Sequence, residues 1–283
     1  MVESIPALRR ESDAQPQVPA SGEAVCLFAF ATVAGVLERR LPGDAGQQRL
    51  MLHKVGSVAA LIGIVPTAEY CGDEAEQRLA DIAWLAPRVR RHAEVVEWAM
   101  QAAPVFPVPF GTLYKSLDSL SAFMQAHEAT IAGFLETVTG KEEWELRASV
   151  QFDSPEILDQ LACNAWPDWR ELPKGIRYMR LCRDRSALLD FGCGEAAALV
   201  GDFIAELLPL TVAVRQHGAR RRSDSNGEEP IARYALLVPK TAIATLRERV
   251  GEMAVRATRQ HVAIALSGPW PPFSFRPDLN SPN

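Results

Sequence analysis

The clearest set of residues with the types and spacing that chemistry needs lies in the middle of the chain. Asp190, Gly192 and Gly194 stand in the run Leu-Leu-Asp-Phe-Gly-Cys-Gly-Glu, and a helical period follows them. A glycine-rich turn between a strand and a helix lets the backbone approach the phosphates or ribose of a nucleotide. The run therefore supports the hypothesis of a nucleotide-binding turn.

The same run resembles the first motif of class I methyltransferases, which would make S-adenosylmethionine the ligand. That site requires a parallel sheet built from several βα units. The residues after Gly194 instead predict an antiparallel hairpin, one helix and one strand. An enzyme that binds S-adenosylmethionine or a nucleotide through Asp190, Gly192 and Gly194 is therefore the alternative hypothesis. We favour the interpretation that the two glycines mark a break between helices or a close helix contact.

Other polar residues do not form a catalytic or metal-binding pattern. The cysteines are scattered without a Cys-x-x-Cys pair, and Glu142 with Glu143 is interpreted as a solvated pair at the end of an element. A basic run, Arg220 to Arg222, lies in a polar loop that it keeps solvated. No histidine has a second His or Cys at ligand spacing among His53, His92, His127, His217 and His261. We therefore predict no catalytic residue, no metal, no cofactor and no enzyme activity.

The composition predicts a globular protein with a sizeable core. Hydrophobic residues make up 48% and charged residues 23% of the 283 residues. The net charge of −5 gives no support to nucleic-acid binding. No apolar run reaches about 18 residues, so we expect no membrane insertion. Residues 1–17 lack the apolar core of a secretory signal. The five scattered cysteines suggest no disulfide framework, so we expect the protein in a reducing cytoplasm.

The first part of the chain predicts a small sheet followed by helices. Apolar runs predict three strands, the last two forming a hairpin, at residues 24–32, 50–54 and 58–65. Helical spacing over residues 73–103 is interrupted by Pro87, so two helices or one kinked helix are expected. Ser116 is the expected N-cap of the next helix, and Gly140 ends it.

The order of elements predicts an α+β protein of two domains. The predicted second domain contains strands at 145–152, 210–217, 231–238 and 261–266, with helical segments between them. Its order β-α-β-β-α-β is that of a ferredoxin-like fold. The chain is thus predicted to consist of a disordered leader (1–22), an N-terminal α+β domain (23–140), the ferredoxin-like domain (141–277) and a tail (278–283).

A proline-rich aromatic run follows the last predicted strand. It comprises Gly268, Pro269, Trp270, Pro271, Pro272, Phe273, Ser274 and Phe275. Its prolines exclude a helix, and a polyproline II conformation with about three residues per turn places Trp270 and Phe273 on one side. Because the run directly follows a strand, we predict that both rings pack inward and seal the domain. Trp270→Ala would then destabilise the fold.

This run resembles the C-terminal signature of the gas vesicle protein GvpF/GvpL family, where Gly-Pro-Trp-Pro-Pro-Tyr-Ser-Phe is usual; Phe273 replaces the tyrosine. A second segment resembles the family pattern Val-x-Pro-x-Arg-Phe-Gly-Thr, after a helix that bears a His like His92. Pro109 stands in the place of the usual arginine. The residues of this segment that match the family are Pro107, Phe110, Gly111 and Thr112.

The resemblance spans roughly residues 23–276. It implies two α+β domains, the second with a modified ferredoxin-like fold. It also implies a non-enzymatic assembly factor or minor structural component of gas vesicles, located at the vesicle or in the cytoplasm. Such proteins bind the small hydrophobic shell protein GvpA, together with other accessory proteins, and help to nucleate the vesicle. An exposed apolar patch is then expected, while the signature residues are expected to be structural.

Overall fold

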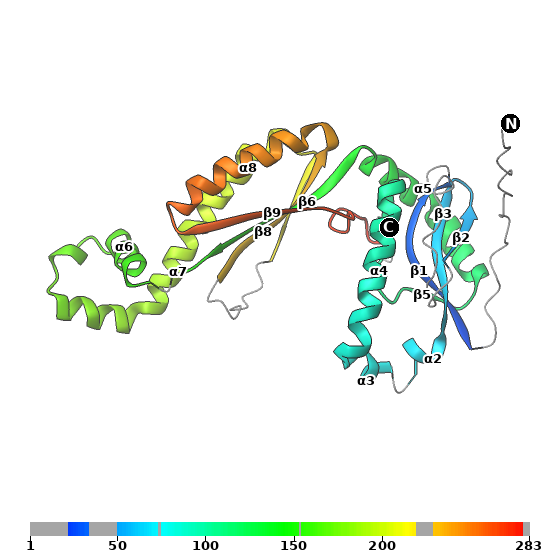
Figure 1. Cartoon of the computed structure of the whole chain (residues 1–283), viewed down its shortest axis with the longest axis horizontal. Helices are drawn as coiled ribbons and strands as arrows, with labels where there is room; N and C mark the ends of the chain where they lie inside the picture. Colours follow the sequence, from blue (N-terminus) through cyan, green and yellow to red (C-terminus); the bar gives the residue numbers. More distant parts are fainter. Residues whose placement is uncertain (1–21, 34–49, 73–74, 153, 219–228, 280–283) are drawn as a thin grey trace, which may run out of the picture. The chain divides into compact units, whose positions relative to one another are not determined.

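The computed structural model describes residues 22–33, 50–72, 75–152, 154–218 and 229–279 (Figure 1). It is a mixed α/β protein with two antiparallel sheets. The chain separates into two compact units, unit 1 (residues 1–139 and 276–283) and unit 2 (residues 140–275). The predicted leader up to residue 21, the basic run Arg220 to Arg222 and residues 280–283 lie outside the described residues.

Unit 1 contains a sheet whose central strand is buried on both faces. Its strands are β1 (Glu23–Thr32), β2 (Met51–Val55), β3 (Val58–Pro66), β4 (Val105–Pro107) and β5 (Leu113–Tyr114). They lie in the order β2-β3-β1-β4, with β5 also on β1. The predicted first strand and hairpin are confirmed, and Gly56 has the positive φ of +57° that their tight turn requires.

Helices α4 and α5 contribute to the core on the two faces of β1. Phe28 of β1 stacks on His92 of α4, while Phe30 stacks on Phe123 of α5. Successive residues of a strand point to opposite faces, so Phe28 and Phe30 would share a face in a regular strand. The one-residue bulge between Leu27 and Ala29 shifts the alternation and lets the two rings reach different helices. This two-sided cover explains why almost every residue of β1 is apolar and buried.

The helices of unit 1 are α2 (Thr67–Tyr70), α3 (Ala75–Ala80), α4 (Ile82–Ala102) and α5 (Leu117–Val138). The predicted interruption at Pro87 is misplaced, because α4 continues through it and the break falls at Asp81. The Asp81 side chain accepts a hydrogen bond from the Ala83 backbone N–H, so the helix begins there. The cap of α5 is confirmed: Ser116 and Ser119 form a reciprocal capping box.

Unit 2 contains a four-stranded sheet in the order β7-β8-β6-β9, antiparallel throughout. Its strands are β6 (Lys141–Val150), β7 (Ala213–His217), β8 (Glu229–Pro239) and β9 (Val262–Trp270). Its helices are α6 (Pro155–Ala165), α7 (Lys174–Leu207) and α8 (Ile243–Thr258), with short 3₁₀ turns between elements. The element order is therefore β-α-β-β-α-β, with two helices in the first crossover.

The last strand is longer than expected and includes the start of the proline-rich run. It was predicted to end at residue 266, whereas β9 continues to Trp270 and pairs there with Glu143 of β6. Because β9 is an edge strand, it has no neighbouring strand on its outer side. A proline, which lacks a backbone N–H donor, is therefore tolerated at position 269. A shift in register near Gly268 accommodates one extra residue in β9.

The glycine pair in α7 does not form a nucleotide-binding turn. Gly192 and Gly194 lie inside α7, whose single residue of non-helical geometry is Asp184. The predicted helix break at the glycines is therefore wrong, and the strand that a nucleotide-binding turn needs is replaced by a helix. The alternative hypothesis of a site for S-adenosylmethionine at Asp190, Gly192 and Gly194 is wrong for the same reason.

The close helix contact, by contrast, is present at one of the two glycines. A Cβ atom at Gly192 would lie 3.0 Å from the side chains of Leu161 in α6 and Phe152, whereas a Cβ at Gly194 would meet nothing within 4 Å. Gly192 is therefore required by packing, and Gly194 is not.

We predict opposite effects of leucine at these two glycines. Gly192→Leu should lower the free energy of unfolding by about 1–3 kcal/mol, because the side chain overpacks the α6–α7 contact. Gly194→Leu, the matched control, should raise it by about 0.5–1 kcal/mol, since leucine favours a helix more than glycine does. Urea denaturation followed by circular dichroism measures both. Equal effects of the two substitutions would contradict the packing role of Gly192.

Candidate functional site

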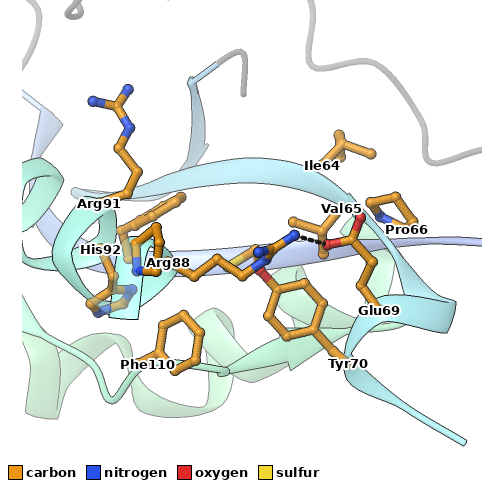
Figure 2. A pocket seen from close by; sticks show the side chains of 12 residues that line it. Ile64, Val65, Pro66, Glu69, Tyr70, Arg88, Arg91, His92 and Phe110 are labelled. Carbon is orange, nitrogen blue, oxygen red and sulfur yellow. Dashed lines mark hydrogen bonds and ion pairs between the residues drawn. The ribbon is translucent and has the colours of Figure 1, made fainter. Parts of the chain in front are cut away.

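A pocket of about 340 Å³ lies in unit 1 and is the first candidate site (Figure 2). Strands β1 and β3, helices α2 and α4 and the segment after β4 supply its walls. The lining side chains are those of Cys26, Phe28, Ile64, Val65, Pro66, Glu69, Tyr70, Pro87, Arg88, Arg91, His92 and Phe110. Phe110 is thus the predicted signature residue that reaches this pocket.

Aromatic rings form one wall of the pocket. The His92 ring stacks on Phe28 at 5.2 Å between centroids and meets the edge of Phe110 at 5.8 Å. The Tyr70 ring lies 6.1 Å from Phe110 and 5.6 Å from Trp84. Each such pair contributes about 0.5–1.5 kcal/mol beyond the area it buries. The rings therefore tie α2, α4 and the segment after β4 together.

Arg88 bridges the pocket from α4 to α2. Its Nη2 donates to Glu69 Oε2 at 2.8 Å, and its Nη1 donates to the backbone oxygen of Trp84 at 3.1 Å. The guanidinium carbon also lies 4.1 Å from the centre of the Trp84 ring, a cation–π distance. Figure 2 shows the ion pair with Glu69 beside the Tyr70 ring. The positive charge of Arg88 in the pocket is thus already paired with the carboxylate of Glu69.

Three titratable groups of the pocket, Cys26, Tyr70 and His92, are held in their neutral forms. Burial raises the pKa of the Cys26 thiol to about 12, so it is not a thiolate at neutral pH. Burial also raises the pKa of Tyr70 and lowers that of His92. His92 Nε2 donates to the Val108 backbone oxygen at 3.0 Å, and its buried Nδ1 has no hydrogen-bond partner. His92 therefore fastens α4 to the chain beside Phe110.

The other signature residues of unit 1 shape the turn between β4 and β5. Pro107 is buried and pairs with Ala29 of β1. Gly111 has a φ of +81°, in the left-handed region that glycine adopts without strain. Thr112 Oγ1 donates to the Pro109 backbone oxygen at 2.7 Å. These contacts stabilise the turn after β4.

The aromatic rings of the C-terminal run point outward, contrary to prediction. Trp270 is 41% exposed and Phe273 is 39% exposed, while Pro271 and Pro272 are buried. The run is not a polyproline II helix, because the Phe273 N–H donates to the Pro271 oxygen and closes a turn. The prediction that both rings seal the domain is wrong, and Trp270→Ala loses its expected cost in stability.

A buried carboxylate holds the run in place instead. Glu143 Oε1 accepts a hydrogen bond from Ser274 Oγ at 2.6 Å, and Glu143 Oε2 accepts one from the Ser274 backbone N–H at 3.1 Å. Because the hydroxyl proton is donated to Glu143, Ser274 Oγ accepts from His217 Nε2 at 3.0 Å. Burial raises the pKa of Glu143, and the bonds from Ser274 oppose that rise. Its interpretation as one of a solvated pair was wrong.

Gly268 is also required by close packing. Its φ of +148° is unfavourable for other residues, and a Cβ there would lie 3.0 Å from the Glu143 backbone oxygen and the Trp144 ring. Phe275, at the other end of the run, lies 5.9 Å from the guanidinium of Arg215. No sequence signal pointed to Glu143, Ser274 and His217 as partners, because they are far apart in the chain.

The two signature segments belong to different units, residues 107–112 to unit 1 and residues 268–275 to unit 2. The residues after the second segment do return to unit 1. There Arg276, Asp278 and Leu279 line a pocket of about 140 Å³ with Pro109 and Thr112. In the part of the chain that the structure describes, no group of three or more His, Cys, Asp or Glu residues could hold a metal ion, and no helix is long and apolar enough to cross a membrane.

Comparison with known proteins gives a consistent result. A family model for gas vesicle synthesis protein GvpL/GvpF matches residues 24–277. Gas vesicle protein L of a Streptomyces species is 25% identical over 244 residues, which cover 85% of this chain and 88% of that protein. Gas vesicle protein L2 of Halobacterium salinarum is 34% identical over 87 residues. That alignment covers 29% of this chain and 30% of the relative's length.

Two crystal structures share the fold. Gas vesicle protein GvpF from Anabaena superimposes with a TM-score of 0.66 at 13% identity, over 90% of this chain and 99% of that one. GvpF from Microcystis aeruginosa superimposes with a TM-score of 0.58 at 14% identity and the same coverage. At these identities the likeness establishes the fold alone.

We predict that His92 makes unit 1 less stable in acid. Its pKa is lowered from 6.5 in the folded state, so the unfolded chain binds the proton more readily as the pH falls below that value. The contribution of neutral His92 to the free energy of unfolding is fully present above pH 6.5. It is lost as the pH falls from that value through the lowered pKa of the folded state. His92→Gln keeps an N–H donor but does not titrate. The stability difference between wild type and variant should therefore shrink from about pH 8 to about pH 5.5 in urea titrations. A constant difference would contradict the buried, neutral state of His92.

We also predict strong coupling between Glu143 and Ser274. Ser274→Ala should lower the free energy of unfolding by about 1.5–3 kcal/mol at neutral pH, because a buried carboxylate loses a charged hydrogen bond. In a Glu143→Gln background the same change should cost clearly less. Because burial raises the Glu143 pKa above 4.5, the penalty should grow as the pH rises from that value. Additive effects in this double-mutant cycle would show that the contact does not hold the run.

Proposed function

The chain belongs to the GvpL/GvpF family of gas vesicle synthesis proteins, whose model matches residues 24–277, and from this membership we propose that it binds the shell protein GvpA and helps to nucleate the gas vesicle. In this role it holds a small hydrophobic subunit until that subunit joins the shell. The protein then acts at the growing vesicle, beside other accessory proteins of the same assembly. No chemical step is required of it.

Exposed apolar side chains are the observation that carries this proposal. Unit 2 exposes Ile176 (52%), Tyr178 (71%) and Met179 (71%), which lie together at the start of α7. Exposed apolar side chains that lie close together are typical of surfaces that bind other proteins. A hydrophobic shell subunit is a partner whose own apolar surface such side chains would cover.

The same membership supports a finer description of the architecture. We infer that units 1 and 2 are two α+β domains with a boundary at residues 139 and 140. The element order of unit 2 and its strand order β7-β8-β6-β9 support a modified ferredoxin-like fold. The pair α6 and α7 in place of a single crossover helix would be the modification. The signature residues Pro107, Gly111, Thr112, Gly268, Pro271 and Pro272 then act by shaping turns.

We predict that the full chain co-purifies with GvpA when the two are co-expressed. The complex should elute as one species on size exclusion, because the chain covers the apolar surface by which GvpA aggregates. The matched comparison is GvpA expressed alone, which should be lost to the pellet. The proposal is wrong if the folded chain leaves GvpA insoluble and a strain lacking this gene, with no second family member, still makes normal vesicles.

A further inference from the structure

The first half of α7, residues 174–187, contains no fully buried residue, and only Arg177, Arg180, Leu181 and Asp184 form a half-buried face. We call this first half the exposed half of α7. The buried residues of the helix begin at Leu188 and continue through its second half to Leu207. In the exposed half, Ile176, Tyr178 and Met179 are among the most exposed apolar side chains of unit 2. A helix of a globular protein normally turns its apolar residues towards a core. These three have no such core within unit 2.

One side of this half is already occupied by contacts with neighbouring residues. Arg180 donates to both carboxylate oxygens of Asp168 at 2.9 and 3.1 Å, and its guanidinium lies 4.4 Å from the ring of Trp166. Arg177 lies 3.8 Å from Asp159, whose Oδ1 accepts from the buried Trp169. These stacked and ion-paired side chains fix the helix beside α6 and the turn that follows it.

The other side faces away from those contacts. Residues three and four positions apart lie on the same side of a helix, so Ile176, Met179 and Arg183 line one strip. Arg180, four positions after Ile176, borders this strip, whereas Arg177 lies further round the helix. Figure 1 shows α6 and the start of α7 lying beyond the end of the β6–β9 sheet. The exposed half is thus a rigid helix with an accessible apolar strip. Asp184, with its non-helical geometry, bends the helix after this strip.

The exposed residues of this half are basic or uncharged: Arg183 lies in the strip, while Lys174 and Arg185 lie beside Tyr178, further round the helix from Ile176. Residues 174–185 contain five basic side chains and a single acidic one, Asp184, in a chain whose net charge is −5. Arg177 and Arg180 are balanced by Asp159 and Asp168. Lys174 and Arg185 are exposed, and the Arg183 side chain is 76% exposed even though it pairs with Asp184. A matching surface would combine apolar residues with Asp or Glu beside them.

We propose that the exposed half of α7 is the docking surface for an acidic, amphipathic helix of the shell subunit. The proposal rests on the proposed function for the identity of the partner and on the structure for the surface and its chemistry. A helix laid along this strip would bury Ile176 and Met179 and place its acids near Arg183. The apolar centre supplies the affinity, and Arg183 sets the orientation.

The test compares binding of GvpA, kept soluble as a fusion, to the full-length chain and its variants. The double variant Ile176→Glu with Met179→Glu should bind at least about 10-fold more weakly, because it places charge in the apolar strip. Arg183→Glu should weaken binding by about 3- to 10-fold and reduce its sensitivity to salt. Circular dichroism and melting curves establish that the variants are folded.

Two controls remove exposed apolar side chains elsewhere in unit 2. Val255→Glu changes a residue of α8 that is 61% exposed, and Trp270→Ala removes the largest exposed ring. Both should bind GvpA as the wild type does. If the α7 variants bind with wild-type affinity while the wild type binds GvpA, the docking surface is wrong and the proposed function stands.

Three further outcomes would show that the exposed half of α7 is not the docking surface for GvpA. If Trp270→Ala alone abolishes binding, the C-terminal run is the docking surface and the inference fails. If the exposed half of α7 is needed only for binding to anionic phosphatidylglycerol vesicles, it is a lipid-binding surface and the inference fails as well. If the wild type does not bind GvpA at all, the proposed function fails and this inference fails with it.

Discussion

A single buried carboxylate determines how the end of the chain is arranged. Glu143 lies in β6 inside the sheet of unit 2, where an ion without hydrogen-bond donors would cost several kcal/mol. The backbone N–H and the hydroxyl of Ser274 supply two donors, so the chain must turn back to β6 after β9. That turn buries Pro271 and Pro272 and leaves Trp270 and Phe273 outside. The next residues then belong to unit 1.

Elements with local causes could be predicted from the sequence. The first strand and the β2–β3 hairpin follow from apolar runs, and the start of α5 follows from the Ser116 cap. Errors arose where a distant partner decides the outcome. Glu143 and Ser274 are 131 positions apart, so no local pattern shows that the carboxylate is buried. Similarly, the glycines of α7 suggested a break, but Gly192 is needed for contact with Leu161 and Phe152.

The pocket of unit 1 shows the same division between local and distant causes. Phe110 and His92 were noted because they belong to patterns that resemble a family. Their contact with each other and with Phe28 depends on β1, α4 and the segment after β4 meeting in space. The Arg88–Glu69 pair joins two helices that the sequence does not pair by spacing. With Cys26 protonated and His92 neutral, the polar groups of this pocket act as ties between elements.

The exposed half of α7, as the proposed docking surface, combines accessible apolar side chains with basic ones. Its apolar side chains need to be accessible, yet accessible apolar side chains promote self-association. Arg183 in the strip and Arg180 at its edge resolve this conflict, because two copies of the strip would bring like charges together. An acidic partner meets no such repulsion. The charge pattern therefore selects a partner of opposite charge over a second copy of the same chain, while the Arg–Trp stacks hold the helix ready to bind.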